Sequence, residues 1–285
     1  MNPSSSPVCT PKMPARLTFH SVKRCGAALL CALTFVLKPA PVSALEPVPE
    51  KLVVLTFDDS VSNHATHVAP LLKKMGFGAT FFITEGFNFL SDKTHYLTWE
   101  QIQELHKQGF EIGNHTRNHK GVAKLEPETL VEEVGYIEQQ CEAHGIPKPK
   151  TFCYPGYGAS PVAAQFLRNR GYLFARAGGG RVFEPGKDDP LLMPQAFDGK
   201  PNSTLESFKA AVENAKNGNV AVLTFHGVPD IQHPWVSTDP TKFESYMNHL
   251  KETGCKVISL GELSRYVDAT KPPGTSSSQP GAPVK

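Results

Sequence analysis

From residue 51 onward, the chain alternates short apolar runs with segments that have the spacing of amphipathic helices. The apolar runs are nearly continuous, which is typical of parallel strands buried on both faces. Strands and helices that alternate in this way predict an α/β fold around a mostly parallel sheet or barrel. The predicted strands are 51–57, 79–83, 111–114, 151–153, 173–175, 220–225 and 256–258.

Helix signals fill the intervals between these strands. Thr98 and Gln101 have the spacing of a capping box, which predicts a helix that begins there and stops near residue 109. Glu126-Pro127 predicts a second helix that runs to about residue 142, because proline is favoured at the first helical position. Further helices are predicted at 161–170, 204–217 and 241–253. The stretch 178–202 is rich in Gly, Pro and Asp and is predicted to be an irregular loop.

The first 44 residues have the pattern of a secretory signal peptide. They contain five basic residues and no acidic one. Four of the basic residues precede an apolar run at 26–37, and the small residues Val42-Ser43-Ala44 come after it. A retained membrane anchor is the alternative, but about a dozen apolar residues are few for a membrane span. We therefore expect cleavage after Ala44, no stable membrane anchor afterwards, and a secreted or periplasmic protein. One domain is predicted to cover 45–270, with a disordered tail at 271–285.

The composition excludes several classes of protein. The 285 residues include 29 Lys and Arg against 27 Asp and Glu, a formal charge of +2 that gives no footprint for nucleic acid. A hydrophobic content of 40% excludes wholesale disorder. Cys141, Cys153 and Cys255 lie in the predicted domain. Two of them could form a disulfide after export, although their spacing does not say which two.

Two adjacent carboxylates, Asp58 and Asp59, follow the first predicted strand. The loops after the strands of α/β folds usually hold the catalytic groups. One carboxylate can bind a metal there while the other acts as a general base. The alternative is that Asp59 or Ser60 only caps the following helix, as is common for an isolated pair of aspartates.

His115 and His119 follow the predicted strand 111–114. On a helical turn, side chains four residues apart lie on one face, so both imidazoles can reach one ion. A zinc protease with this spacing needs Glu beside the first His, and Thr116 stands there instead, which excludes that class. Taken alone, two histidines with this spacing are more often surface residues than ligands.

A third feature is His226, which follows the apolar strand 220–225. A buried structural histidine is the default interpretation of such a residue. Together, however, a carboxylate, a histidine pair and a separate histidine supply three ligands, an open position and an acid–base partner. That set is typical of a catalytic divalent-metal site.

At these residues the chain resembles the polysaccharide deacetylases with the NodB-homology domain, carbohydrate esterase family 4. Thr56-Phe57-Asp58-Asp59 is similar to the family's first motif, which implies Asp58 as the base and Asp59 as a metal ligand. His115-Thr116-Arg117-Asn118-His119 matches the second motif and implies that both histidines are ligands. Leu223-x-x-His226 resembles the fifth motif and implies His226 as the general acid.

The segment 152–158 resembles the third motif, which lines the groove and supplies a backbone N–H to the oxyanion. The resemblance therefore implies that Pro155, Gly156 and Tyr157 contact substrate, with the N–H belonging to Gly156 or Tyr157. It also implies a deformed (β/α)7-type barrel and a divalent metal, Zn²⁺ first and Co²⁺, Ni²⁺ or Mn²⁺ as alternatives. The implied reaction is hydrolysis of acetyl groups on a polysaccharide or oligosaccharide, most of all the N-acetyl of a GlcNAc-containing glycan.

The chain departs from the family pattern in two places. Cys153 stands where the third motif has an arginine that orients the base, and a thiol cannot make a charged bidentate hydrogen bond. Arg176 or Arg181 could replace that arginine. The fourth motif, an Asp and a Trp, is not recognisable, and Asp230 and Trp235 are the candidates to partner the acid histidine and to line the pocket. The chain is thus a divergent relative.

Two alternative functions remain open. A glycan-binding protein that has lost turnover would explain the missing motif residues. A non-haem Fe(II) oxygenase also uses two histidines and a carboxylate, but it leaves Asp58 and His226 without roles. His64 and His67 could approach the metal, although an amphipathic helix surface is the plainer interpretation, and His233 is equally open.

Overall fold

The computed structural model describes residues 44–270 and residue 273. The predicted leader and tail therefore lie outside the described residues, except for Ala44 and Pro273. The strands are β1 (Leu52–Phe57), β2 (Thr80–Ile83), β3 (Glu111–Asn114), β4 (Thr151–Cys153), β5 (Phe174–Arg176), β6 (Phe197–Asp198), β7 (Ala221–Phe225) and β8 (Lys256–Ile258). The helices are α1 (Ala69–Met75), α2 (Trp99–Lys107), α3 (Pro127–Ala143), α4 (Pro161–Asn169), α5 (Leu205–Glu213) and α6 (Pro240–Glu252).

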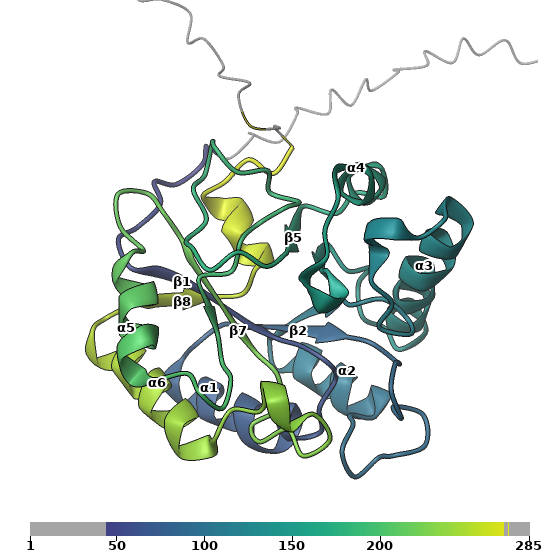
Figure 1. Ribbon diagram of the computed structural model, residues 1–285, viewed down its shortest axis with the longest axis horizontal. Coiled ribbons are helices and arrows are strands. Elements are labelled where there is room, and N and C mark those ends of the chain that lie inside the picture. The colour runs from purple at the N-terminus through teal and green to yellow at the C-terminus, as the bar shows by residue number, and fades with distance from the viewer. Residues whose placement is uncertain (1–43, 271–272, 274–285) are drawn as a thin grey trace, which may run out of the picture. The chain divides into compact units, whose positions relative to one another are not determined.

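All strand pairs in the sheet are parallel, in the order β5-β4-β3-β2-β1-β7-β6. β8 pairs with the first half of β1, at Leu52–Val54, while β2 pairs with its last two residues. Figure 1 shows β1, β7 and β8 crossing the middle of the molecule, with α5 and α6 on one flank and α3 and α4 on the other. The architecture is a parallel half-barrel with helices outside it, the barrel type that the resemblance implies.

The two edges of the half-barrel are connected through the stretch predicted as an irregular loop. Met193 exchanges backbone hydrogen bonds with β5, through the carbonyl of Ala175 and the N–H of Ala177. A few residues later, the N–H of Ala196 donates to Val222 of β7, and β6 pairs with the same strand. The prediction of a structureless loop was therefore wrong at 193–198, because a two-residue strand is too short to show a periodicity.

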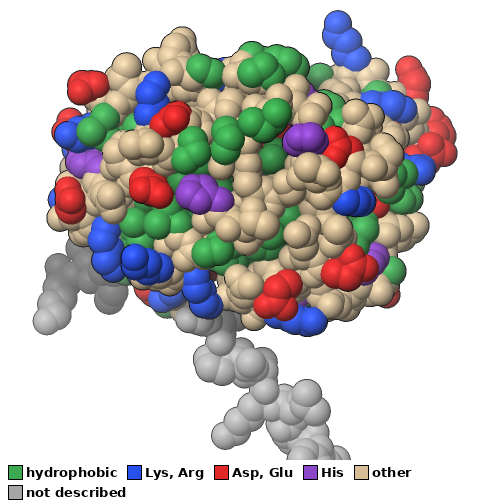
Figure 2. Space-filling model, turned by 90° about the horizontal axis from the view of Figure 1, so that it is seen from below, with side chains coloured by type: hydrophobic (Ala, Val, Ile, Leu, Met, Phe, Trp, Pro, Cys, Tyr) green, Lys and Arg blue, Asp and Glu red, His purple; other side chains and the backbone are tan. Residues whose placement is uncertain are grey.

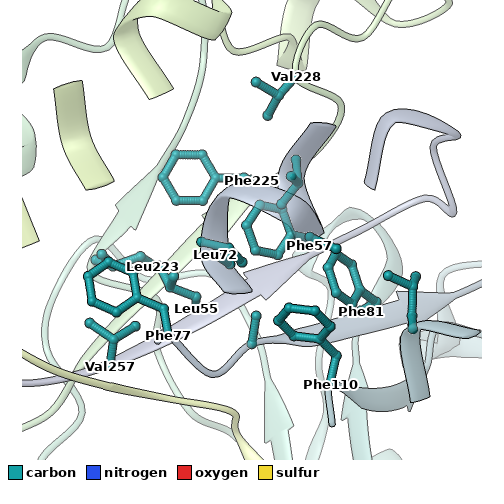
Figure 3. Close-up of a cluster of buried hydrophobic side chains, with 14 of the residues drawn as sticks. Leu55, Phe57, Leu72, Phe77, Phe81, Phe110, Leu223, Phe225, Val228 and Val257 are labelled. Atoms are coloured by element: carbon teal, nitrogen blue, oxygen red, sulfur yellow. The ribbon is translucent and has the colours of Figure 1, made fainter. Parts of the chain in front are cut away.

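The side chains of β1 alternate between two cores, as the period of a strand requires. Val53, Leu55 and Phe57 pack with the helices, whereas Leu52 and Val54 belong to a second cluster formed with other strands. The ring of Phe57 stacks on the rings of Phe81 and Phe225 at centroid distances of 5.2 and 5.6 Å. Figure 3 shows these three rings side by side. The first core thus fixes the ends of β1, β2 and β7.

The seven strands that the apolar runs predict are all present, and the helix starts are confirmed. The side chain of Thr98 accepts from Gln101 N–H, and the Gln101 side chain accepts from Thr98 N–H, so the capping box of α2 is complete. Among the described residues, no helix is both long and apolar enough to cross a membrane. The face drawn in Figure 2 carries interspersed acidic and basic side chains, with apolar side chains gathered beside histidines.

Candidate active site

Four strands end with ionisable side chains at one edge of the sheet. Asp58 and Asp59 follow β1, His115 follows β3, Arg176 ends β5 and His226 follows β7. Because the strands are parallel, their carboxyl ends meet at this edge, as in other α/β enzymes. A cavity of about 190 Å³ opens there. Its lining consists of Asp58, Asp59, Phe87, His115, His119, Gly156, Tyr157, His226, His233, Trp235 and Val236.

A larger cavity of about 750 Å³ lies at the amino end of β3, beside Val257 of β8 and Ser259, which follows that strand. Its lining includes Glu111, Lys148 and Glu262, and it shares no residue with the cavity at the carboxyl edge. Glu111 is fully engaged there, because it accepts hydrogen bonds from Thr80, Thr151 and Gly261. We place the functional site in the smaller cavity, where the ionisable groups converge.

Asp59 lies in a tight turn that the end of β1 supports. Asp59 and Ser60 both adopt left-handed φ values, 70° and 55°, which aspartate tolerates better than most residues. The hydroxyl of Ser60 donates to the Thr84 carbonyl and accepts from the Thr84 N–H, which ties the turn to the end of β2. The turn points both aspartates into one cavity.

Asp59, His115 and His119 form a cluster whose ligand atoms all lie within 4.8 Å of one another. Oδ1 of Asp59 is 3.4 Å from Nε2 of His115 and 3.3 Å from Nε2 of His119, and it is buried without a hydrogen-bond partner. Burial opposes the charge of Asp59, but His115 and the other histidines outweigh it and lower its pKa. One carboxylate and two imidazoles suit Zn²⁺ and related divalent ions.

The two histidines meet without a helix, so the expectation of a helical turn was wrong. Thr116 and His119 have left-handed φ values of 64° and 54°, and the side chain of Asn114 accepts from the Thr116 N–H. This turn, rather than an i, i+4 relationship, brings both rings to Asp59. Nδ1 of His115 is 2.8 Å from the Cys153 carbonyl, a contact that orients the ring as carbonyl partners do in metal sites.

Asp58 is 1% exposed and lies beside this cluster. Nη2 of Arg176 donates to Oδ2 of Asp58 at 2.5 Å, and Nη1 donates to Oε1 of Gln195 at 2.9 Å. Burial raises the pKa of Asp58, but Arg176, His115 and His226 outweigh it, so the pKa lies below its usual value. The carboxylate is therefore held ionised.

His226 faces both aspartates through its Nε2, which is 3.8 Å from Oδ2 of Asp58 and 3.9 Å from Oδ2 of Asp59. Its Nδ1 is buried without a hydrogen-bond partner. The expectation that Asp230 partners His226 was wrong, because the Asp230 carboxylate instead lies 3.4 Å from Nδ1 of His233. His64 is buried beside the backbone of His226, with its Nε2 3.0 Å from the His226 carbonyl.

Gly156 and Tyr157 also line the cavity and have left-handed φ values of 61° and 64°. The Tyr157 N–H already donates to the Tyr154 carbonyl at 2.9 Å, which favours Gly156 as the donor among the two predicted ones. The Tyr157 hydroxyl donates to Asp198 of β6 at 2.7 Å. Pro155 is buried beneath them and does not line the cavity.

The family model for polysaccharide deacetylases matches residues 46–175 of this chain. A peptidoglycan-N-acetylglucosamine deacetylase of Bacillus cereus is 26% identical over 222 residues, which are 77% of this chain and 91% of the relative. A putative polysaccharide deacetylase of Bacillus subtilis is 35% identical over 170 residues, 59% of this chain and 58% of the relative. The structure of a family 4 acetyl xylan esterase from Clostridium thermocellum, in complex with a cobalt ion, superposes with a TM-score of 0.53 at 25% identity, covering 74% of this chain and 89% of that one.

These matches support a NodB-homology member of the polysaccharide deacetylase family. The fold is that of carbohydrate esterase family 4, a family whose members are hydrolases. The divergence of this chain lies in the arginine beside Asp58, which comes from β5 at Arg176, while Cys153 takes the place on β4. The other candidate arginine, Arg181, is half exposed and pairs with Asp188.

Several residues around the cavity gave no signal in the sequence. Phe87 packs on His119 with a centroid distance of 4.7 Å, and Gln195 and Asp198 support Arg176 and Tyr157. They come from loops and from the short β6, where neither motif nor periodicity marks them. Trp235, by contrast, lines the cavity as predicted. His67 is in neither metal-type cluster found among the described residues.

Proposed function

We propose that the protein is a metal-dependent deacetylase that removes acetyl groups from a glycan, foremost the N-acetyl group of GlcNAc units. The observation that carries this proposal is the grouping of the Asp59–His115–His119 cluster with buried Asp58 and with His226 around one cavity. Such a cavity supplies three ligands, a base and an acid within reach of one bound acetyl group.

Asp59, His115 and His119 would hold the ion. When bound, a divalent ion polarises an acetyl carbonyl and lowers the pKa of water. Zn²⁺ fits the ligand set best, because one carboxylate and two imidazoles are among its common protein ligands, and Co²⁺, Ni²⁺ and Mn²⁺ are alternatives. Oδ1 of Asp59, buried and unpartnered, supports this assignment.

Asp58 takes the proton of the attacking water, since Arg176 keeps its carboxylate ionised and fixed in orientation. The N–H of Gly156 donates to the oxygen on which negative charge develops. His226, protonated at Nε2, then donates to the leaving amine, which is too basic to leave as an anion. These roles use each carboxylate and imidazole that lines the cavity except His233.

The choice of a glycan rests on family membership and on the aromatic side chains of the rim. The relative from Bacillus cereus acts, by its name, on N-acetylglucosamine of peptidoglycan. The basic, then apolar, then small-residue pattern of residues 1–44 supports export, which would bring the protein to extracellular or periplasmic glycans. A catalytically impaired glycan-binding protein was suggested by the missing arginine and by the missing fourth motif. The contact of Arg176 with Asp58 removes the first of these two reasons.

The experiment is an acetate-release screen on acetylated glycans, with the metal-loaded protein before and after chelation. We expect release that stops on chelation and returns with Zn²⁺. His119→Ala should lose both bound metal and acetate release, whereas His106→Ala, on α2 away from the cavity lining, should keep both. Acetate release by metal-free His119→Ala protein would contradict the proposal.

A further inference from the structure

The Tyr157 side chain joins the loop after β4 to the strand β6, and the mechanism above gives this contact no role. Tyr157 lines the cavity, and its hydroxyl donates to Oδ2 of Asp198 at 2.7 Å. Burial raises the pKa of the Tyr157 hydroxyl, and the Asp198 carboxylate adds to the effect, so the hydroxyl stays a protonated donor. A hydrogen bond to a carboxylate is shorter and stronger than one between neutral groups.

Asp198 is placed for this contact by a strand and by a lysine. It ends β6, where it pairs with Thr224 of β7, and its side chain is 13% exposed. Nζ of Lys200 lies 2.7 Å from the same Oδ2, whereas Oδ1 is buried without a hydrogen-bond partner. The contacts of this carboxylate are therefore concentrated on the oxygen that faces Tyr157. Asp198 is not part of the cavity lining, so any influence on the reaction passes through another residue.

The ring of Tyr157 is also held from other sides. The guanidinium carbon of Arg176 is 5.4 Å from the ring centroid, and Nζ of Lys200 is 5.8 Å from it. Cations at such distances are attracted to the face of an aromatic ring. At Gly178, a Cβ would lie only 3.0 Å from the Cβ of Tyr157, so the backbone of residue 178 packs closely against this side chain. The ring has little room to move while its hydroxyl stays bonded.

The backbone that carries this ring adopts an unfavourable conformation. Gly156 and Tyr157 have consecutive left-handed φ values, which glycine tolerates but which are uncommon for a bulky residue such as tyrosine. The Tyr157 N–H closes the turn on the Tyr154 carbonyl at 2.9 Å. Backbone strain of this kind persists only where the surrounding structure holds it. The contact with Asp198 holds the turn 154–157 from a strand on another part of the sheet.

We propose that Asp198 is a positioning residue: through the Tyr157 hydroxyl, it holds the turn 154–157 in the conformation that offers the Gly156 N–H to the developing oxyanion. The inference rests on the proposed function and adds to it a residue outside the cavity lining. Because this N–H is needed most where negative charge develops, loss of the contact should lower kcat and leave KM nearly unchanged.

The first test removes a single hydroxyl from metal-loaded protein. Tyr157→Phe keeps the ring, and it should lower kcat for acetate release about tenfold or more while KM and bound metal stay within about twofold. Asp198→Ala should have a similar effect and should add nothing in the Tyr157→Phe background, because both variants break the same contact. Tyr136→Phe is the matched control. Its hydroxyl also donates to a carboxylate, that of Glu85 at 2.9 Å, but Tyr136 is not part of the cavity lining, and kcat should be unchanged.

The second test does not depend on turnover. Hydrogen exchange of the Tyr157 amide in the folded protein reports how often the turn opens. We expect this exchange to be about tenfold faster or more in Tyr157→Phe and in Asp198→Ala than in wild-type protein, whereas the amides of β1 should exchange as before. Tyr136→Phe should leave the exchange of the Tyr157 amide at the wild-type rate.

The outcomes separate the two proposals. Acetate release with unchanged kcat and unchanged exchange of the Tyr157 amide in both variants would keep the activity and overturn the positioning role. A rise in KM as large as the fall in kcat would also overturn it, because the contact would then serve substrate binding. Absence of acetate release from every glycan, with faster exchange of the Tyr157 amide in both variants, would refute the deacetylase activity and keep the control of the turn by Asp198.

Discussion

Arg176, at the end of β5, donates a hydrogen bond to Asp58, at the end of β1, and both side chains are almost completely buried. The same Nη2 lies 2.5 Å from Sγ of Cys153, the residue that occupies the family's arginine position on β4. Gln195 accepts from the other terminal nitrogen of Arg176 and also from the Thr224 hydroxyl. Asp58, the proposed base, is thus oriented by a strand different from the one that the family motif implies.

Removal of Arg176 should therefore affect both stability and activity. Loss of one partner of a buried ion pair destabilises a protein by about 3–5 kcal/mol. We expect Arg176→Ala to lower the free energy of unfolding by about this amount. Arg176→Lys keeps the charge but cannot reach Asp58 and Gln195 together, and it should lower kcat at least tenfold while bound metal is retained. Cys153→Ala should leave kcat within a few-fold of wild type, and a larger loss would give the thiol the orienting role instead.

Gly86 is packed against the loop that carries His119. A Cβ at this position would lie 2.8 Å from the Cβ of His119 and 3.0 Å from the carbonyl carbon of Asn118. Gly86→Ala should therefore displace His119 and weaken metal binding about tenfold or more, as measured by competition with a chromogenic chelator. Gly121→Ala is the matched control, because its Cβ would have no atom nearer than 3.8 Å. Equal metal affinity of the two variants would contradict the expectation.

The buried His64 should make the fold sensitive to acid. Burial lowers its pKa from 6.5 to about 4, so the folded state favours the neutral ring. Its contribution to stability is complete above pH 6.5 and is lost as the pH falls toward 4, because the unfolded chain binds the proton first. The loss amounts to about 3 kcal/mol. In His64→Gln, which does not titrate, denaturant unfolding should show a shallower decline between pH 6.5 and 4, whereas His106→Gln should follow wild type.

The three cysteines of the described residues are free, so the disulfide considered from the sequence does not form among them. Cys141 and Cys153 are buried, and burial raises both pKa values, that of Cys141 to about 12. Because the thiolate is the reactive form, these two should resist alkylation in the folded protein. Partly exposed Cys255 should react first. Peptide mapping after timed alkylation measures the order, and rapid labelling of Cys153 in folded protein would contradict it.

Much of this structure follows from local sequence. The apolar runs and helix caps predicted seven strands and the principal helices, since burial on both faces and capping depend on residues a few positions apart. The motifs also predicted which residues enter the cavity, because a residue at the end of a parallel strand must lie at the carboxyl edge. Asp58, Asp59, His115 and His226 could therefore be grouped before their distances were known.

The contacts between distant segments were decided only by the tertiary structure. The space beside Asp58 can be filled from β4 or from β5, because both strands end there. Only the packing decides that Arg176 contacts Asp58, whereas Arg181 pairs with Asp188. The link through β6 and the pairing of Asp230 with His233 instead of His226 likewise depend on how loops fold across the sheet edge. The sequence by itself determined where the strands lie along the chain and which proposed catalytic groups stand at their ends. The neighbours of those groups required the fold, because side chains far apart in the chain meet only when the sheet brings their strands together.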